Sequence, residues 1–375
     1  MRRRTFLTGL AGLTARGFAR AQESGVHFIS LLPPGPGNPR NTEGDFIELK
    51  DGTLLFAYTK FTGGGGDHDT ASIASRTSSD GGASWSNEDR TLLENEGGMN
   101  VMSVSFLRGS DGRILFFYLR KNSETDCHAM LRTSSDEGKT WGEAVDCTPD
   151  PGYFVLNNDR AVELKRGRLV LPVALHTEDG KWAGRGKVMF YLSDDMGKKW
   201  RRSKAVIECP VPSKAGLQEP GVVELKDGRL MVFCRTMLGS QYVAYSRDGG
   251  ETWSQAAPSA LASPLSPASI ERIPKTGDLL AVWNDHADVD AAMRADNDAG
   301  KGGLRTPLSV AISRDEGKTW SNRKNILSDP EGWYCYTAID FWRDRVLLAY
   351  VAGGSGLPRL SRTQIAWFPV DFLYR

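Results

Sequence analysis

Apolar segments of strand length recur along the chain, and each is followed by a short polar turn and a second apolar segment. In most copies the turn contains glycine, as expected between two strands of a β-hairpin. The pattern predicts six hairpins and an all-β fold class. The predicted hairpins are Phe46–Tyr58, Val104–Tyr118, Ala161–Leu175, Val222–Cys234, Ile270–Trp283 and Ala338–Val351.

A second motif, Ser-x-Asp-x-Gly-x-x-Trp, follows each of the first five hairpins, with aspartates 56, 59, 53 and 67 residues apart. Serine and aspartate can bond backbone N–H groups within a turn, glycine supplies a left-handed position, and tryptophan packs between neighbouring sheets. We therefore interpret the motif as scaffolding rather than as an array of metal ligands. The copies are Ser78–Trp85, Ser134–Trp141, Ser193–Trp200, Ser246–Trp253 and Ser313–Trp320.

Repeats of roughly 50 to 60 residues with about four short strands each are typical of β-propeller blades. Six repeats account for nearly the whole chain, so one domain, a six-bladed β-propeller with five Asp-motif turns, is expected. Two further apolar segments, Val26–Leu32 and Thr363–Val370, are predicted to join one sheet and close the ring, which removes exposed sheet edges. Ala287–Gly303 is interpreted as an insertion in blade five that accounts for the long last step.

The first 21 residues contain five arginines and no acidic residue. An arginine triplet at positions 2–4 precedes a modestly apolar run and a small-residue pattern that ends at Ala21. This arrangement predicts a twin-arginine-type signal peptide over residues 1–21 and export to the periplasm or the extracellular space. A basic, frayed amino terminus is the alternative. Residues 22–375 then form the propeller.

The 375-residue chain is 40% hydrophobic and 25% charged, with 47 basic and 46 acidic side chains. Without residues 1–21 the balance becomes 42 basic to 46 acidic groups. No nucleic-acid partner is expected, because such a partner calls for a basic surface. No segment approaches the ~18 apolar residues of a membrane span.

Five cysteines at irregular spacing, without a Cys-x-x-Cys pair, indicate neither a zinc site nor a disulfide scaffold, although one disulfide is an alternative. The five histidines have no metal-ligand spacing. Asp285, Asp288 and Asp290 form a weak calcium-binding pattern. No phosphate-binding Gly-x-x-x-x-Gly-Lys loop is present. We therefore expect neither a metal nor a cofactor.

Polar residues precede the first strand of each predicted hairpin. In a propeller these positions converge on the central axis, where acids, amides and hydroxyls suit a sugar-binding pocket. Counting six residues back from the equivalent Leu49, Leu164 and Leu225 gives Glu43, Asn158 and Glu219.

The repeated motif is an Asp box, and over approximately residues 26–375 the sequence resembles the sialidase (neuraminidase) superfamily of Asp-box (BNR) propellers as a divergent member. The resemblance implies an exo-acting glycoside hydrolase that removes terminal, acidic sugars from a glycan or oligosaccharide. It also implies a tyrosine nucleophile assisted by a glutamate, an aspartate as acid/base, and three arginines that bind the substrate carboxylate.

The segment from Gln218 to Arg235 resembles the family's blade-four signature and implies that Glu219 is the partner glutamate and Arg235 a carboxylate-binding arginine. Arg305, ahead of the fifth Asp box, is similar in position to another carboxylate-binding arginine of the family. Further along, Cys335-Tyr336-Thr337 resembles the nucleophile segment, which makes Tyr336 the candidate. In blade one, the glycine-rich loop offers Asp67 as the acid/base, with Asp69 as a rival.

The resemblance fails at one point, because Asp45 stands where the family has its first carboxylate-binding arginine. Arg160 is expected either to compensate by pointing into the funnel or to pair with Asp45. As alternatives to catalytic roles, Tyr336 is a core tyrosine, and Glu219 forms only a buried ion pair with Arg235. For the whole protein, a different or neutral sugar, a non-catalytic glycan-binding propeller and a protein-assembly scaffold are further alternatives.

Overall fold

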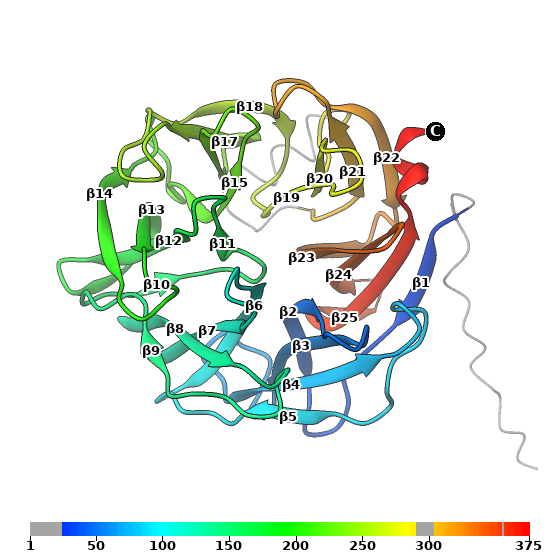
Figure 1. Ribbon diagram of the computed structural model, residues 1–375. Helices are drawn as coiled ribbons and strands as arrows, with labels where there is room; N and C mark the ends of the chain where they lie inside the picture. Colours follow the sequence, from blue (N-terminus) through cyan, green and yellow to red (C-terminus); the bar gives the residue numbers. More distant parts are fainter. Residues whose placement is uncertain (1–24, 290–303, 355) are drawn as a thin grey trace, which may run out of the picture.

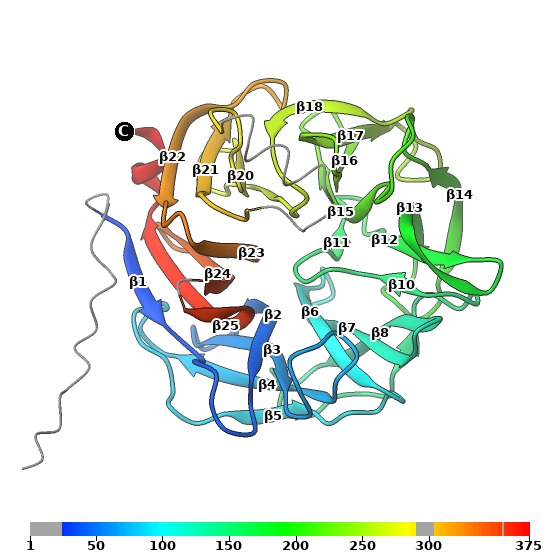
Figure 2. The same ribbon diagram turned by 180° about the vertical axis from the view of Figure 1, so that it is seen from behind.

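The computed structural model describes residues 25–289, 304–354 and 356–375. Within these ranges six antiparallel sheets surround a central axis (Figures 1 and 2), which confirms the six-bladed β-propeller. The predicted signal peptide at residues 1–21 and residues 290–303 of the proposed insertion lie outside the described residues. No helix in the described ranges is long and apolar enough to cross a membrane.

Blades one to three follow each other along the chain, and each runs outward from an inner strand near the axis. Blade one contains β2 (Arg40–Glu48), β3 (Leu54–Phe61), β4 (Ala71–Ser78) and β5 (Arg90–Leu93). Blade two contains β6 (Asn100–Arg108), β7 (Ile114–Ser123), β8 (Asp126–Ser134) and β9 (Val145–Asp146). Blade three contains the short inner strands β10 (Phe154–Val155) and β11 (Val162–Glu163), then β12 (Leu169–Glu178), β13 (Lys181–Ser193) and β14 (Arg201–Ile207).

Blades four to six complete the ring. Blade four contains β15 (Gln218–Glu224), β16 (Leu230–Arg235), β17 (Ser240–Ser246) and β18 (Ala257–Ala262). Blade five contains β19 (Ser269–Arg272), β20 (Leu279–Trp283), β21 (Leu308–Ser313) and β22 (Ser321–Leu327). Blade six contains β23 (Gly332–Trp342), β24 (Arg345–Gly354), β25 (Leu357–Pro369) and β1 (His27–Ser30), and a 3-10 helix, η1 (Val370–Tyr374), follows.

The two ends of the described chain close the ring in blade six. His27 of β1 lies opposite Trp367 of β25, and Ser30 lies opposite Gln364, in an antiparallel pair. This pairing confirms the closure predicted from the two terminal apolar segments. The backbone groups at the outer edge of β25 are thereby hydrogen-bonded to a strand from the other end of the chain. The segment that follows β1 leads into blade one, so the closure joins the first and last blades.

The Asp-box turns have the local hydrogen bonds that their composition predicts. In blade four Ser246 Oγ donates to Asp248 Oδ1 at 2.8 Å and accepts from the backbone N–H of Gly250 at 2.9 Å. The indole of Trp253 then stacks on Phe190 of blade three, with ring centroids 4.3 Å apart. The motif therefore joins neighbouring blades and contributes no group to the axis.

The inner strands carry β-bulges at the end where the pocket forms. In β2, β6, β15 and β23 the register shifts by one residue near the start of the strand. Each bulge places a non-glycine residue at a positive φ. This backbone conformation is strained, and strained residues are found most often at functional sites. The four bulge residues are Glu43 (φ 52°), Ser103 (59°), Glu219 (45°) and Tyr336 (55°). In blade three, Asp159 also has a positive φ, of 56°.

Candidate active site

Two bulge residues, one from blade four and one from blade six, meet near the axis. The hydroxyl of Tyr336 on β23 donates to Glu219 Oε1 on β15 at 3.1 Å, although the residues are 117 positions apart. Burial, with Glu219 beside it, raises the pKa of the phenol above its ordinary value. The structure thus brings together the phenol and carboxylate that the sequence paired.

Arg235 and Arg305 lie beside this pair. Arg235 Nη1 is 2.7 Å from Glu219 Oε1, and the guanidinium carbon of Arg305 is 5.4 Å from the centre of the Tyr336 ring. Burial opposes ionisation of Glu219, but Arg235 and Arg305 outweigh it and lower the pKa of this carboxyl. Arg305 is 5% exposed, and its Nε and Nη1 have no hydrogen-bond partner within the described part of the chain. Glu219 is therefore ionised at neutral pH, next to buried cations.

A third buried arginine, Arg40, is a residue that the sequence reasoning missed. It is 1% exposed at the start of β2, where Arg40 Nη1 is 2.5 Å from Asp67 Oδ1 and Nη2 is 3.3 Å from Glu43 Oε2. Its charge also acts on the Tyr336 hydroxyl, as do the charges of Arg235 and Arg305. Arg40 therefore places a buried cation five residues before Asp45, the position at which the family resemblance fails.

The bulge explains why Arg40 was overlooked. Arg40 lies opposite Phe61 in the hairpin, immediately before the loop that carries Asp67. The family resemblance places Asp45 at the position of the first arginine, whereas the extra residue at Glu43 changes the direction of the side chains at the start of the strand. An arginine ahead of the predicted strand and opposite the glycine-rich loop was the available signal.

Asp67 and Asp69 have different roles in the glycine-rich loop. Asp69 Oδ2 accepts the backbone N–H of Gly66 at 2.7 Å, so Asp69 shapes the turn. Asp67 keeps a 60% exposed side chain in contact with Arg40. Burial within the loop raises the pKa of Asp67, but Arg40 outweighs this effect and holds the pKa below its ordinary value. The structure therefore favours Asp67 over its rival as the group available to a ligand.

Two buried side chains of blade two hold the Asp67 backbone. Asn100 Nδ2 donates to the carbonyl of Asp67 at 3.0 Å and to that of Asp69 at 2.8 Å. Lys121 is 2% exposed, and its Nζ donates to the Asp67 carbonyl at 2.6 Å. The loop is thus pinned at the residue whose carboxylate faces the pocket.

Glu43 and Asn158 lie at the axis as expected but support other groups. Glu43 is 5% exposed, and its Oε2 accepts from Thr42 Oγ1 at 2.8 Å. Burial raises the pKa of Glu43 in spite of Arg40. Asn158 is completely buried, and its Nδ2 donates to the carbonyls of Gly44 at 2.9 Å and Tyr336 at 3.1 Å. Asn158 therefore holds the Tyr336 backbone rather than lining the pocket.

One expectation for Arg160, an ion pair with Asp45, needs correction. Its Nη2 donates to the carbonyl of Ala268 at 2.6 Å, and its Nη1 donates to Ser269 Oγ at 3.3 Å, so the side chain joins blade three to blade five. Asp45 Oδ1 and Oδ2 accept the backbone N–H groups of Phe46 and Phe106, each at 2.7 Å. Arg160 is thus a buried link between two blades and is not the ion-pair partner of Asp45.

The other chemical features of the sequence lie away from this pocket. All five cysteines are free and buried, which excludes a disulfide between them. Asp285 pairs with Arg323 at 3.0 Å, Asp290 falls outside the described residues, and the described part of the chain contains no group of acids, cysteines and histidines placed to hold a metal ion.

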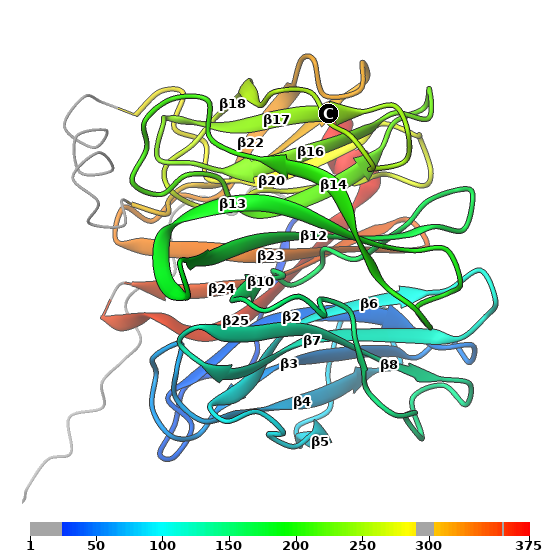
Figure 3. The ribbon, with the colours of Figure 1, turned by 90° about the vertical axis from the view of Figure 1, so that its left-hand side faces the viewer.

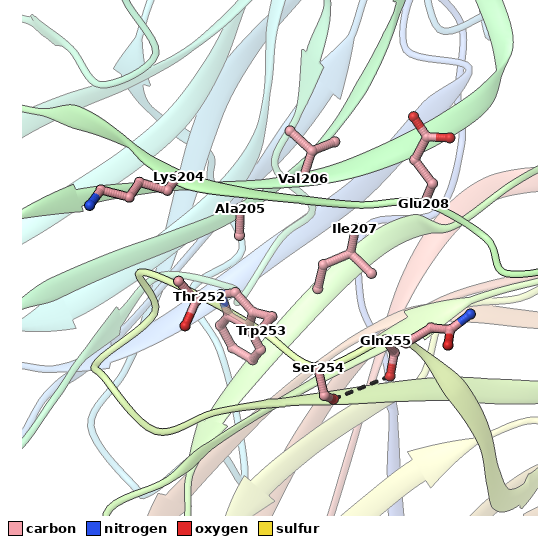
Figure 4. Close-up of a pocket in the computed structure, with 9 residues that line it drawn as sticks. All are labelled: Lys204, Ala205, Val206, Ile207, Glu208, Thr252, Trp253, Ser254 and Gln255. Atoms are coloured by element: carbon pink, nitrogen blue, oxygen red, sulfur yellow. Dashed lines mark hydrogen bonds between the residues drawn. The ribbon is translucent and has the colours of Figure 1, made fainter.

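A surface groove between blades three and four is lined by neither Tyr336 nor Glu219. Figure 4 shows it between β14 and the turn that follows the Asp box of blade four. Its volume is about 360 Å³, and its walls include Val206, Ile207 and Trp253. The residues that line it bring no converging pair of acid and base groups, so we assign it no chemistry.

Comparison with known proteins agrees with this architecture. The family model described as the BNR repeat-like domain matches residues 99–348, more than half of the chain. The six-bladed ring with Asp-box turns agrees with this family. The chain therefore belongs to the BNR repeat-like domain family, within the sialidase superfamily.

Particular relatives are distant. A sialidase from Micromonospora viridifaciens is 26% identical over 410 residues, covering 96% of this chain and 58% of that protein. A protein of unknown function from Dyadobacter fermentans DSM 18053 has the same fold, with a TM-score of 0.71, 18% identity, and coverage of 92% and 99%. Trypanosoma rangeli sialidase, solved as a covalent intermediate with 2,3-difluorosialic acid, gives a TM-score of 0.69, 17% identity, and coverage of 93% and 60%. The chain thus spans 58% of the length of its curated relative.

Proposed function

We propose that this protein is an exported, exo-acting glycoside hydrolase that removes a terminal acidic sugar from glycans with retention of configuration. The observation that carries the proposal is the 3.1 Å contact between the Tyr336 hydroxyl and Glu219 Oε1, surrounded by buried arginines. Export rests on the arginine-rich segment at residues 1–21. The class of reaction rests on the pocket and on the family.

The pair suits nucleophilic attack by a phenol. A free phenol has a pKa near 10, and burial raises that of Tyr336 further, so attack needs a base in contact with the hydroxyl. Glu219 accepts the proton as the phenol oxygen bonds to the anomeric carbon and the glycosidic bond breaks. A neutral nucleophile also avoids repulsion by a carboxylate at that carbon, where a two-carboxylate enzyme would place like charges together.

Asp67 completes the reaction in this proposal. It donates a proton to the leaving oxygen, and in the second half of the reaction it removes a proton from the water that cleaves the glycosyl–tyrosine bond, while Glu219 returns its proton to the departing Tyr336 oxygen. Its side chain is 60% exposed on a loop held by Asn100 and Lys121, so it can reach an oxygen above the pocket. Both half-reactions then use the same carboxyl group.

The arginines favour an acidic sugar, and Arg40 links binding to proton transfer. Guanidinium groups bind carboxylates through paired N–H donors, and three surround this pocket. Before substrate binds, Arg40 holds Asp67 in its ionised form. A substrate carboxylate that bonds to Arg40 weakens this ion pair, and the pKa of Asp67 then rises. A larger fraction of Asp67 is then protonated, as a general acid must be.

Two relatives support the class of reaction. The Micromonospora viridifaciens protein is a sialidase, and Trypanosoma rangeli sialidase forms a covalent intermediate with a difluorinated acidic sugar. A non-catalytic glycan-binding propeller is the second candidate, favoured by the direct ion pair between Glu219 and Arg235, which is sufficient to explain both side chains. In that case Tyr336→Phe leaves every measured activity unchanged.

The test is a screen of aryl glycosides of sialic acid, other ulosonic acids, uronic acids and neutral sugars. We expect wild type to hydrolyse one acidic glycoside and Tyr336→Phe to lose at least about 1,000-fold in kcat, the size of effect seen when a nucleophile is removed. The 2,3-difluoro analogue of that sugar should lose its anomeric fluoride to the Tyr336 oxygen, so the Tyr336 peptide of wild type should gain the mass of the analogue less HF. Turnover of no glycoside, or a label on another residue, contradicts the proposal.

A further inference from the structure

The hairpin between β12 and β13 presents an indole to solvent near the pocket. Trp182 is 54% exposed, the largest value among the exposed large hydrophobic side chains of the described residues. Phe154 of the inner strand β10 lies opposite Leu175 of β12, so this hairpin extends from the end at which the inner strands begin. Figure 3 shows it projecting on the left of the disc, on the same side as the turn between β24 and β25.

The base of this hairpin is fixed to the segment that leads into Glu219. The backbone N–H of Gly186 donates to the carbonyl of Ala215 at 2.8 Å, and that of Leu217 donates to Gly186 at 3.1 Å. Gln218, the residue before Glu219, donates from its side chain to the carbonyl of Gly184 at 2.9 Å. Blade three thus places Trp182 in a fixed position relative to the carboxylate of blade four.

One face of the indole is already covered. The imidazole of His176 stacks on Trp182, with ring centroids 6.1 Å apart and an angle of 13° between planes. His176 is 7% exposed, and its Nδ1 lies 3.0 Å from the carbonyl of Ala183, so Nδ1 carries the proton. Burial lowers the pKa of His176, and the charges of Glu219 and Arg235 both reach it. His176 therefore lies beside the indole and within reach of the charges of Glu219 and Arg235, while Trp182 stays 54% exposed.

We propose that Trp182 is the platform of a leaving-group subsite that binds the pyranose ring next to the terminal sugar. This inference rests on the proposed function, because exo-cleavage places the terminal sugar in the axial pocket and directs the rest of the glycan over the rim. The apolar C–H face of a pyranose packs on an aromatic ring, and an exposed aromatic beside a polar pocket marks a binding surface. The ligand class is a neutral sugar ring attached to the acidic one.

The test compares two substrates of the acidic sugar that wild type accepts. One is its glycosyl fluoride, which has no ring at the leaving-group position, and the other carries a neutral disaccharide. For Trp182→Ala we expect KM for the disaccharide substrate to rise about tenfold, equivalent to ~1.4 kcal/mol, and kinetics on the fluoride to stay within about twofold. Trp182→Phe should recover most of the loss. Val206→Ala, at a 50% exposed residue on the outer strand β14, should match wild type on both substrates.

The outcomes separate this subsite from the proposed function. Equal losses on both substrates, or no loss on either, refute the subsite while hydrolysis by wild type still supports the function. If wild type cleaves neither substrate, hydrolysis is refuted and calorimetry on the Tyr336→Phe protein decides the subsite. There Trp182→Ala should weaken binding of the whole oligosaccharide about tenfold, again ~1.4 kcal/mol, and leave binding of the acidic monosaccharide unchanged. Equal affinities for the oligosaccharide with and without Trp182→Ala overturn the inference.

Discussion

The buried ion pair of Arg235 and Glu219 gives a prediction that is independent of catalysis. Their side chains are 12% and 11% exposed, and Arg235 Nη1 lies 2.7 Å from Glu219 Oε1. Arg235→Leu leaves the carboxylate buried without its closest cation, a change that typically costs 3–5 kcal/mol. Because Arg305 still acts on Glu219, we expect a loss of about 3 kcal/mol, at the lower end of that range.

A double-mutant cycle isolates this energy. Glu219→Gln removes the charge but keeps an oxygen that can accept from the Tyr336 hydroxyl, so Arg235→Leu in that background should cost only about 1 kcal/mol. The coupling of about 2 kcal/mol is measured by urea denaturation followed by tryptophan fluorescence at pH 7.5. As a matched control, the more exposed pair Lys187 and Glu178, 27% and 60% exposed, should couple by less than about 1 kcal/mol.

The same pair has a defined pH dependence. Its arginines lower the folded-state pKa of Glu219, so its contribution to stability is present above the unfolded-state pKa, about 4.3, and is lost as pH falls through the folded-state value. The stability difference between wild type and Arg235→Leu should therefore shrink in acid. If Arg235→Leu is equally destabilising in the wild-type and Glu219→Gln backgrounds, or equally at pH 7.5 and in acid, the ion-pair explanation is refuted.

Two further predictions concern residues outside the pocket. Ser246→Ala, which leaves the Gly250 N–H without its 2.9 Å partner, should lower the free energy of unfolding by about 1–3 kcal/mol in urea titrations, and an unchanged midpoint would show that the Asp-box serine is dispensable. Asp159 has a pKa raised to about 6, chiefly by burial, so its contribution to stability is present below pH ~4 and lost as pH rises through 6. Asp159→Asn should therefore raise Tm at pH 8 more than at pH 4, and a pH-independent change in Tm speaks against this titration.

The hairpins and Asp boxes could be predicted because their determinants are local. Each turn contains its own serine, aspartate and glycine within a few residues, so no distant contact is needed to form it. The inner strands were predicted too short, since β2 begins at Arg40 and the apolar pattern begins at Phe46. The bulge at Glu43 interrupts the alternation of side chains, and the residues before it are polar because they face the axis.

Site residues were predictable only where a recognisable segment carried them. Glu219 and Tyr336 lie in such segments, and the ring brings them into contact. Arg160 was judged by analogy with the position of Asp45, but its hydrogen bonds depend on where blade five places Ala268. Trp182 has no local motif, and its exposure and its stack on His176 become visible only once the hairpin is folded.

The sequence by itself determined the number of blades, the closure of the ring and the identity of the phenol and carboxylate at its axis. It could do so because repeated turns and apolar strands encode each blade through short-range hydrogen bonds and burial. Only the tertiary structure added Arg40 to the predicted Arg235 and Arg305, because a one-residue bulge changes the register at the start of β2. The hydrogen bonds of Arg160 likewise depend on how blades three and five pack. Charges at an axis are set by the convergence of distant strands, and no local pattern in the chain specifies that convergence.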